Sequence, residues 1–108
     1  FNDRDDVVVM PRNKWAKSSC WLYSIRLSNF DNAKILIKYL LKNGIESKLF
    51  WFGLANQPPY VKYKNVLSGV SKSLSGTVLS LPCSSSLSYK DQLKVIDAFK
   101  KWKGEKLI

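Results

Sequence analysis

Histidine is absent from this 108-residue chain, which also contains only two cysteines and five glycines. Without an imidazole, a serine or cysteine nucleophile lacks its commonest activating base, and zinc loses a common ligand. The glycines never fall into a GxGxxG or P-loop pattern, and the carboxylates Glu46, Asp91 and Asp97 stand apart from one another. We therefore expect no catalytic, cofactor-binding or metal-binding residue within this chain.

Long hydrophobic runs are also lacking. No apolar stretch approaches the ~20 residues of a membrane helix, and residues 1–6 do not have the pattern of a signal peptide. The cysteines Cys20 and Cys83 lie in apolar, strand-like settings without a CxxC partner. We expect a cytoplasmic protein that makes no membrane contact and whose two cysteines are buried free thiols; a disulfide is the alternative.

Acidic residues are scarce: the chain has 8 of them and 18 lysines and arginines, which gives a net charge of +10. Such a charge attracts phosphates and nucleic acid, although most charged side chains simply face water. Between residues 51 and 64 aromatic residues are interleaved with lysine, as in a base-stacking groove, but no RNA-binding motif accompanies them. A small basic nucleic-acid or polyanion-binding module is therefore kept as the alternative function. We do not expect a nucleic-acid partner for this chain.

The spacing of apolar residues predicts an α+β domain. Residues 31–43 have helical spacing, with one face formed by Ala33, Leu36, Ile37, Leu40 and Leu41. Asn29 or Asp31 is placed to cap the start of this helix, and Gly44 is placed to end it. Strands are predicted at 19–27, 48–52 and 77–81, and a short helix at 66–75.

A last helix is predicted to begin at Ser88, which forms a capping-box pattern with Asp91. Its apolar face is predicted to consist of Leu93, Ile96, Phe99 and Trp102, with Val95 at the flank. The elements together predict a small two-layer sandwich: a mainly antiparallel sheet of about three strands with helices on one face. Residues 1–17 are expected to be a linker from a missing large domain, and residues 18–108 the domain itself.

Residues 44–60 carry the most specific pattern. They contain Gly44-Ile45-Glu46-Ser47-Lys48, aromatic residues at 50–52, and Gln57-Pro58-Pro59-Tyr60. Trp21-Leu22-Tyr23-Ser24-Ile25 comes before them, and a Leu-x-Leu-Pro segment at 79–82 comes after them. In this order the segments resemble the DegT/DnrJ/EryC1/StrS family of sugar aminotransferases, which depend on pyridoxal phosphate. The resemblance covers about residues 18–102.

The resemblance implies that the chain is the C-terminal small domain of a fold-type I aminotransferase. The parent enzyme would transfer an amino group to a nucleotide-linked keto-sugar, for surface polysaccharide precursors. Pyridoxal phosphate and its lysine would lie in the missing large domain, so that this chain alone would be inactive. The implied partners are that large domain, a second subunit of a homodimer, and the nucleotide-sugar substrate.

Four substrate-binding residues follow from the resemblance: Lys48, Asn56, Gln57 and Tyr60. The structural alternatives are that Lys48 is solvated, that Gln57 caps the turn and that Tyr60 packs under the last helix. Three positions depart from the family pattern, because Lys48, Gly53 and Ala55 stand where the family usually has Arg, Pro and His. Lysine lacks the planar fork of arginine, and the histidine contact is lost. A family member retained for protein contacts alone is therefore a third possibility.

Overall fold

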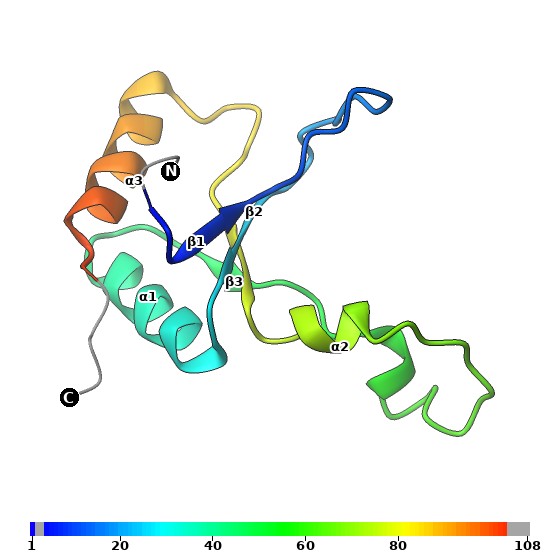
Figure 1. Cartoon of the computed structure of the whole chain (residues 1–108). Helices are drawn as coiled ribbons and strands as arrows, with labels where there is room; N and C mark the ends of the chain where they lie inside the picture. Colours follow the sequence, from blue (N-terminus) through cyan, green and yellow to red (C-terminus); the bar gives the residue numbers. More distant parts are fainter. Residues whose placement is uncertain (2–3, 104–108) are drawn as a thin grey trace.

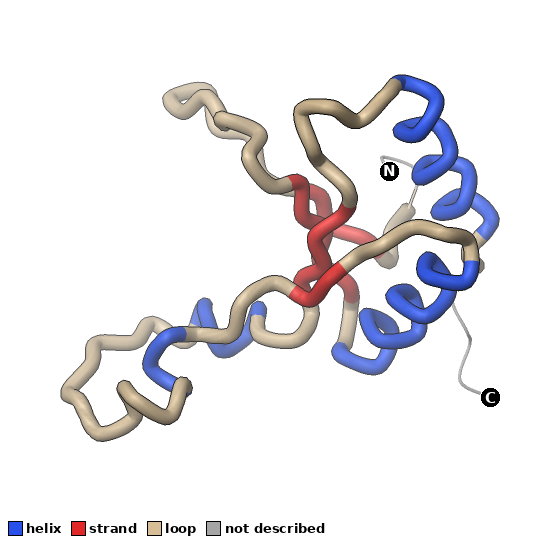
Figure 2. The backbone as a smooth tube through the Cα atoms, turned by 180° about the vertical axis from the view of Figure 1, so that it is seen from behind, coloured by secondary structure: helices blue, strands red, loops and turns tan. Residues whose placement is uncertain are grey.

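The computed structural model describes Phe1 and residues 4–103, in which four short strands form one antiparallel sheet with the order β1-β2-β4-β3 (Figure 1). The two long helices, α1 and α3, lie side by side on one face of this sheet, as Figures 1 and 2 both show. The elements in chain order are β1 (Val7–Val9), β2 (Tyr23–Leu27), α1 (Phe30–Lys42), β3 (Lys48–Leu49), the 3-10 turn η1 (Leu54–Asn56), α2 (Val70–Leu74), β4 (Val78–Leu81) and α3 (Tyr89–Lys101).

The predicted α+β class and the two-layer arrangement are confirmed, and the sheet has one strand more than expected. Val7–Val9 pair with β2 as an antiparallel edge strand, in a register that sets Val8 opposite Arg26. Val7 thereby joins the core, because its side chain points to the helix-covered face. Segment 1–17 therefore contributes to the sheet, while its role as a linker stays a prediction.

Helix α1 begins and ends where local chemistry predicts. The side chain of Asn29 accepts a hydrogen bond from the backbone N–H of Asn32 at 2.8 Å, which satisfies an otherwise unpaired donor of the first turn. Gly44 follows the helix with φ of 71°, a left-handed conformation that glycine adopts without steric penalty. Leu36 and Leu40 are fully buried, but Leu41 is exposed. The predicted apolar face of this helix therefore includes one residue, Leu41, that does not belong to the core.

Helix α3 confirms the predicted cap and corrects the predicted face. Ser88 accepts from the backbone N–H of Asp91 at 3.1 Å, and its hydroxyl donates to the Asp91 carboxylate at 2.6 Å. A row spaced by three residues drifts around the helix by about 60° at each step, so it cannot stay on one face. A spacing that alternates between three and four residues does stay on one face. The core accordingly contains Val95, Ala98, Phe99 and Trp102, whereas Leu93 and Ile96 are partly exposed.

Two arms project from the same side of the molecule, away from α1 and α3 (Figures 1 and 2). One consists of residues 10–22 and is called here the 10–22 arm. The other, the 50–76 arm, carries η1 and α2. The radius of gyration is 15.5 Å, compared with roughly 13 Å for a compact domain of this length. The arms account for the extended shape.

The arms also shorten three predicted elements. Strand β2 begins only at Tyr23, so Trp21 is 70% exposed. Strand β3 ends at Leu49, since the chain leaves the sheet there for the 50–76 arm. Helix α2 begins after Gly69, whose φ is 86°, and Val66 is 99% exposed. Sequence periodicity does not detect where a strand loses its neighbour or where a chain turns outward.

The two cysteines are free thiols in the structure. Cys83 is half-buried just after β4, and its sulfur lies 3.3 Å from the carbonyl oxygen of Trp21. Cys20 is exposed, contrary to the prediction that both thiols are buried. The reason is that the chain at Cys20 has not yet entered the sheet and belongs to the 10–22 arm.

Candidate functional site

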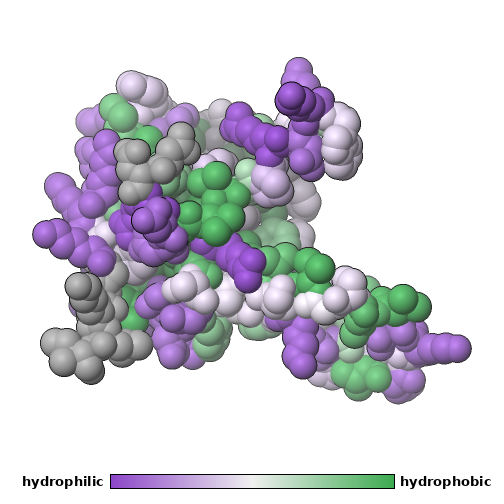
Figure 3. Space-filling view, in the orientation of Figure 1, coloured by the Kyte–Doolittle hydropathy of each residue, from purple (hydrophilic) through white to green (hydrophobic). Residues whose placement is uncertain are grey.

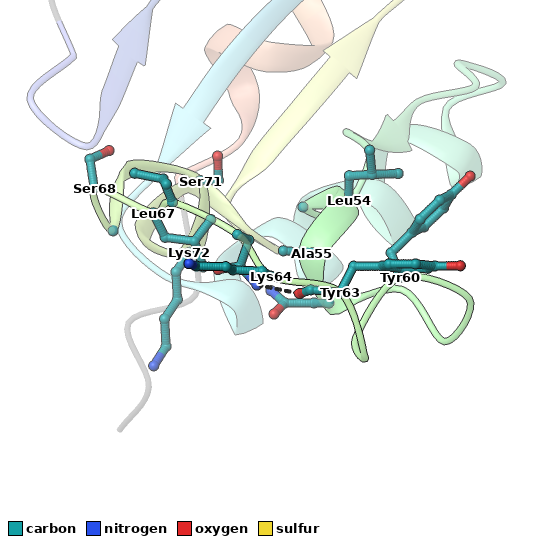
Figure 4. A pocket seen from close by; sticks show the side chains of 14 residues that line it. Leu54, Ala55, Tyr60, Tyr63, Lys64, Leu67, Ser68, Ser71 and Lys72 are labelled. Carbon is teal, nitrogen blue, oxygen red and sulfur yellow. Dashed lines mark hydrogen bonds between the residues drawn. The ribbon is translucent and has the colours of Figure 1, made fainter.

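The 50–76 arm encloses an open pocket of about 580 Å³ (Figure 4). Its walls come from η1, from the loop that follows it and from the start of α2. Figure 4 shows Tyr60 and Tyr63 at one end of the pocket and Lys72 at the other. Two lysines, Lys64 and Lys72, line it, and none of its lining residues is acidic. The pocket therefore combines aromatic surface with positive charge.

The turn that shapes this pocket is built by Gln57. Its side-chain amide donates to the carbonyl oxygen of Phe52 at 3.3 Å, and its backbone N–H donates to Leu54 at 3.1 Å. The carbonyl of Gln57 in turn accepts from the backbone N–H of Tyr60 at 2.8 Å. Gln57 thus spans the turn from both sides, and the following Pro58 has no N–H that could compete for these acceptors.

The four predicted substrate-binding residues do not all meet at this pocket. Asn56 and Tyr60 line it, and Gln57 holds the turn between them. Tyr60 lies on the arm, so it does not pack under the last helix. Lys48 lies in β3 outside the pocket, where its ammonium group pairs with Glu46 at 3.1 Å. The binding roles of all four residues stay predictions.

A second pocket of about 550 Å³ lies between the two arms. The indole rings of Trp21 and Trp51 form one side, with their centroids 5.9 Å apart. Ser24 also lines the pocket, and its hydroxyl is hydrogen-bonded to that of Ser80 on the neighbouring strand at 3.1 Å. No charged residue lines this pocket. The first pocket, which carries two lysines, and this uncharged pocket adjoin, because Gly53 and Ser71 line both of them.

Several pocket residues were not among the predicted site residues. Trp51 and Lys64 belong to the aromatic and lysine alternation at 51–64, which signals a surface where planar groups and anions could bind. The same alternation is the feature that indicates the alternative function, a polyanion-binding module. Lys72 carries no signal of its own, because it reaches the pocket only through the fold of the arm. Figure 3 shows hydrophobic side chains on this arm among hydrophilic ones.

The clearest perturbed ionisable pair lies elsewhere, beside α3. The guanidinium of Arg4 hydrogen-bonds both carboxylate oxygens of Asp6. This bonding holds the pKa of Asp6 below its usual range and raises the pKa of Arg4, in spite of partial burial. Arg4 and Asp6 line neither pocket. The pair is therefore structural.

The fold and the pockets define a small α+β domain with an open pocket on its 50–76 arm. The amino-acid sequence matches the DegT/DnrJ/EryC1/StrS aminotransferase family over residues 1–100. This chain belongs to that family.

Solved structures agree with this assignment. The chain is similar to a DegT DnrJ EryC1 StrS aminotransferase from Brucella abortus, with 31% identity and a TM-score of 0.78 over 94% of this chain and 27% of that chain. It shares its fold with a sugar aminotransferase from Micromonospora echinospora, at 17% identity and a TM-score of 0.76 over 91% and 26% of the two chains. An aminotransferase from Streptoalloteichus hindustanus gives 20% identity and a TM-score of 0.76 over the same shares, 91% and 26%. The chain thus spans about a quarter of the length of these structures. No curated protein matches it significantly.

Aminotransferases of this family use pyridoxal phosphate, and the described residues do not fit this cofactor by themselves. Every lysine within residues 4–103 is exposed, whereas the lysine that binds such a cofactor must be enclosed and desolvated. Over the same residues there is no cluster of three or more metal-ligating side chains. Nor does any helix there have the length and hydrophobicity to cross a membrane.

Proposed function

We propose that this chain is the C-terminal small domain of a nucleotide-sugar aminotransferase and supplies one wall of its substrate site. The observation that carries this proposal is the family match over residues 1–100. It is supported by the share of about a quarter that the chain covers in the similar structures. The arm around Gln57 offers amide, hydroxyl and aromatic groups on a fixed turn, which suits the positioning of a sugar substrate.

The proposed reaction moves an amino group, commonly from glutamate, to a keto-sugar carried on a nucleotide, as a step toward surface polysaccharide. Pyridoxal phosphate would supply the electronics of the reaction and would be held by the rest of the protein, in a large domain and with a second subunit. The part of this chain would be to position substrate through Asn56, Gln57 and Tyr60. We place the whole protein in the cytoplasm, where nucleotide sugars are made.

The test compares the full protein that carries this chain with the 108-residue chain alone. The full protein, supplied with pyridoxal phosphate and glutamate, is expected to form 2-oxoglutarate only when a nucleotide-linked keto-sugar is added. The isolated chain is expected to show neither this activity nor the visible absorbance of bound pyridoxal phosphate. Full protein that is inactive with every such sugar, or an isolated chain that binds the cofactor, contradicts the proposal.

One observation favours the alternative of a polyanion-binding module. A hollow of about 440 Å³ between the ends of α1 and α3 is lined by Lys38, Lys42, Lys101 and Lys103. If it binds nucleic acid, the logarithm of affinity should fall linearly with the logarithm of salt concentration. Absence of binding to DNA, RNA and heparin at low salt removes this alternative.

A further inference from the structure

The two cysteines of the chain line one and the same pocket, although they stand 63 positions apart in the sequence. This pocket of about 380 Å³ lies beside α3, where β2 begins and β4 ends. Cys20 reaches it from the 10–22 arm, and Cys83 reaches it from the segment that follows β4. Both are free thiols; Cys20 is exposed and Cys83 is half-buried. The fold therefore brings two reactive groups to one place.

The register of β2 and β4 explains why the two cysteines meet. These antiparallel strands end their pairing with Tyr23 opposite Leu81. Two residues further on, the same register sets Trp21 opposite Cys83, and the thiol of Cys83 does donate to the carbonyl oxygen of Trp21 at 3.3 Å. Consecutive Cα atoms are about 3.8 Å apart. Cys20 is therefore one residue away from the group that Cys83 contacts.

A break in the strand alternation brings Cys20 to the same side as Cys83. In a regular strand successive side chains point to opposite faces, so Cys20 and Tyr23 would lie on different faces. Both line the pocket beside α3, whereas Trp21 and Leu22 both line the pocket between the arms. The backbone of Cys20 has φ of 55°, in the left-handed region that residues other than glycine seldom adopt. The reversal of the chain there accompanies the change of side.

The surroundings of the two thiols favour oxidation over other thiol chemistry. Zinc in a structural site takes four ligands, and the described residues contain no group of three or more metal-ligating side chains. A cysteine nucleophile needs a neighbouring base or cation, but no charged residue lines this pocket and the chain has no histidine. A disulfide needs only the second thiol, which is present.

We propose that Cys20 and Cys83 form a reversible disulfide when the protein meets an oxidised small-molecule disulfide such as oxidised glutathione. The exposed Cys20 gives its proton to solvent, and its thiolate attacks one sulfur of the oxidant. The disulfide bond of the oxidant breaks, and one glutathione leaves as a thiolate, which takes up a proton. Cys83 then loses its proton, attacks the sulfur of Cys20 and displaces the second glutathione. Two protein thiols are oxidised, and one oxidant is reduced to two thiols.

The bond would fasten the root of the 10–22 arm to the end of β4. Paired backbone stops at Tyr23 and Leu81, so the chain beyond them lacks the support of the sheet. Trp21 follows Cys20 directly, and its ring lies 5.9 Å from that of Trp51 on the other arm. Oxidation would therefore restrict the side of the pocket between the arms that Trp21 forms. An exposed disulfide of this kind belongs to the easily reduced class, which serves regulation in reducing compartments.

The test places the full protein in mixtures of reduced and oxidised glutathione, blocks the remaining thiols and maps the peptides by mass spectrometry. A linked pair of peptides that contains Cys20 and Cys83, lighter by two hydrogen atoms, should increase with the share of oxidised glutathione and disappear with dithiothreitol. Cysteines that stay reduced, that carry only glutathione, or that pair with other cysteines of the full protein contradict the proposal.

Single substitutions test the order of the two steps. Cys83→Ser removes the second thiol, so glutathione should stay attached to Cys20. Cys20→Ser should leave the half-buried Cys83 mostly reduced, because its access to the oxidant is poorer. The opposite pattern would mean that Cys83 reacts first. Amide exchange of residues 18–22 should slow about threefold on oxidation of the parent and not change in Cys83→Ser; equal exchange in both would show that the bond does not fasten the arm.

A matched control moves one thiol by three residues. Cys83→Ser combined with Ser86→Cys keeps two cysteines, but Ser86 is exposed and does not line the pocket. This variant should form much less of the linked peptide pair than the parent under the same conditions. Linkage to the same extent would mean that the proximity of Cys20 and Cys83 in the pocket is not the cause.

Discussion

Arg4 fastens the beginning of the described chain to the end of α3. Its guanidinium donates to the carbonyl oxygens of Phe99 and Trp102 at 3.2 and 2.6 Å, and lies 5.0 Å from the centroid of the Phe99 ring. Carbonyls at a helix C-terminus lack intrahelical partners and carry partial negative charge. One arginine therefore caps α3, while Asp6 holds its guanidinium in place.

This arrangement predicts a pH-dependent effect of Asp6→Asn. The folded-state pKa of Asp6 is lowered chiefly by the hydrogen bond from Arg4, so its stabilising contribution is fully present above the unfolded pKa of about 3.9. It is lost as the pH falls through the lowered folded pKa. Urea unfolding should show Asp6→Asn less stable than the parent at neutral pH, with the difference shrinking as the pH falls below about 3.9.

The control for this prediction is Asp5→Asn, which changes the same charge one residue away. Asp5 is exposed and takes part in none of the ion pairs found in the described chain. A small effect that does not depend on pH is expected. If both variants gave the same pH-dependent difference, long-range charge and not the Arg4 contact would be the cause.

Two glycines with similar backbone conformation predict different tolerance to substitution. Gly69 and Gly76 have φ of 86° and 75°, so alanine at either position costs about 1–2 kcal/mol of strain. At Gly76 a Cβ would also lie 2.7 Å from Cδ2 of Phe30, whereas at Gly69 it would meet open space. Chemical denaturation should show Gly76→Ala as the less stable variant by about a further 1 kcal/mol.

A double-mutant comparison isolates the contact with Phe30. In a Phe30→Ala background the ring is gone, so the two glycine substitutions should become equally destabilising. A difference that persists in this background would refute the steric explanation.

The capped ends of the two long helices, α1 and α3, are the features that the sequence predicts best. Ser88→Ala removes the hydroxyl that accepts from the backbone of Asp91 and should destabilise the chain by about 1 kcal/mol. Thermal unfolding measures the loss. Ser85→Ala is the matched control, because Ser85 lies in the exposed loop before α3; an equal effect of the two variants would argue against the cap.

Why some elements are predictable and others are not follows from the range of the forces that form them. The caps at Asn29, Gly44 and Ser88 depend on neighbours within four residues, so a pattern in the sequence is sufficient. The buried face of α3 depends on what packs against it, which a single helix does not record. Strand β1 depends on a partner 18 residues further along the chain, since Val8 lies opposite Arg26.

In the candidate site, too, features that depend on sequence neighbours are predictable and features that depend on distant parts of the chain are not. The turn at Gln57 is predictable, because its two prolines and its amide stand together in the sequence. Lys72 joins the pocket from α2, after a loop without periodicity. The adjacency of the two pockets at Gly53 exists only once both arms are folded.

At the scale of the whole molecule, the exposed apolar side chains of the 50–76 arm predict a covering partner. Val61, Val66 and Leu67 are all at least 60% exposed, and the chain covers about a quarter of the length of similar structures. We expect residues 61–69 to exchange amide hydrogens quickly in the isolated chain and slowly in the full protein. Mass spectrometry of hydrogen exchange measures this, with the 10–22 arm followed in parallel.

The comparison contains its own control, because α1 has a buried face within this chain and should be protected in both forms. Rapid exchange of residues 61–69 in the full protein as well would mean that the arm remains uncovered. In that case the apolar side chains would be free for a ligand or another protein.

The shortness of the two edge strands of the sheet has a consequence for solubility. Strands β1 and β3 occupy the two edges and contain only three and two residues, so they offer few unpaired backbone groups to a passing chain. Removal of residues 1–17 would uncover β2, which has five residues and three buried side chains. A longer edge of this kind is a template for intermolecular pairing. The three valines near the N-terminus therefore act as a guard against aggregation, and a shortened chain that begins at residue 18 should precipitate at concentrations at which this one stays in solution.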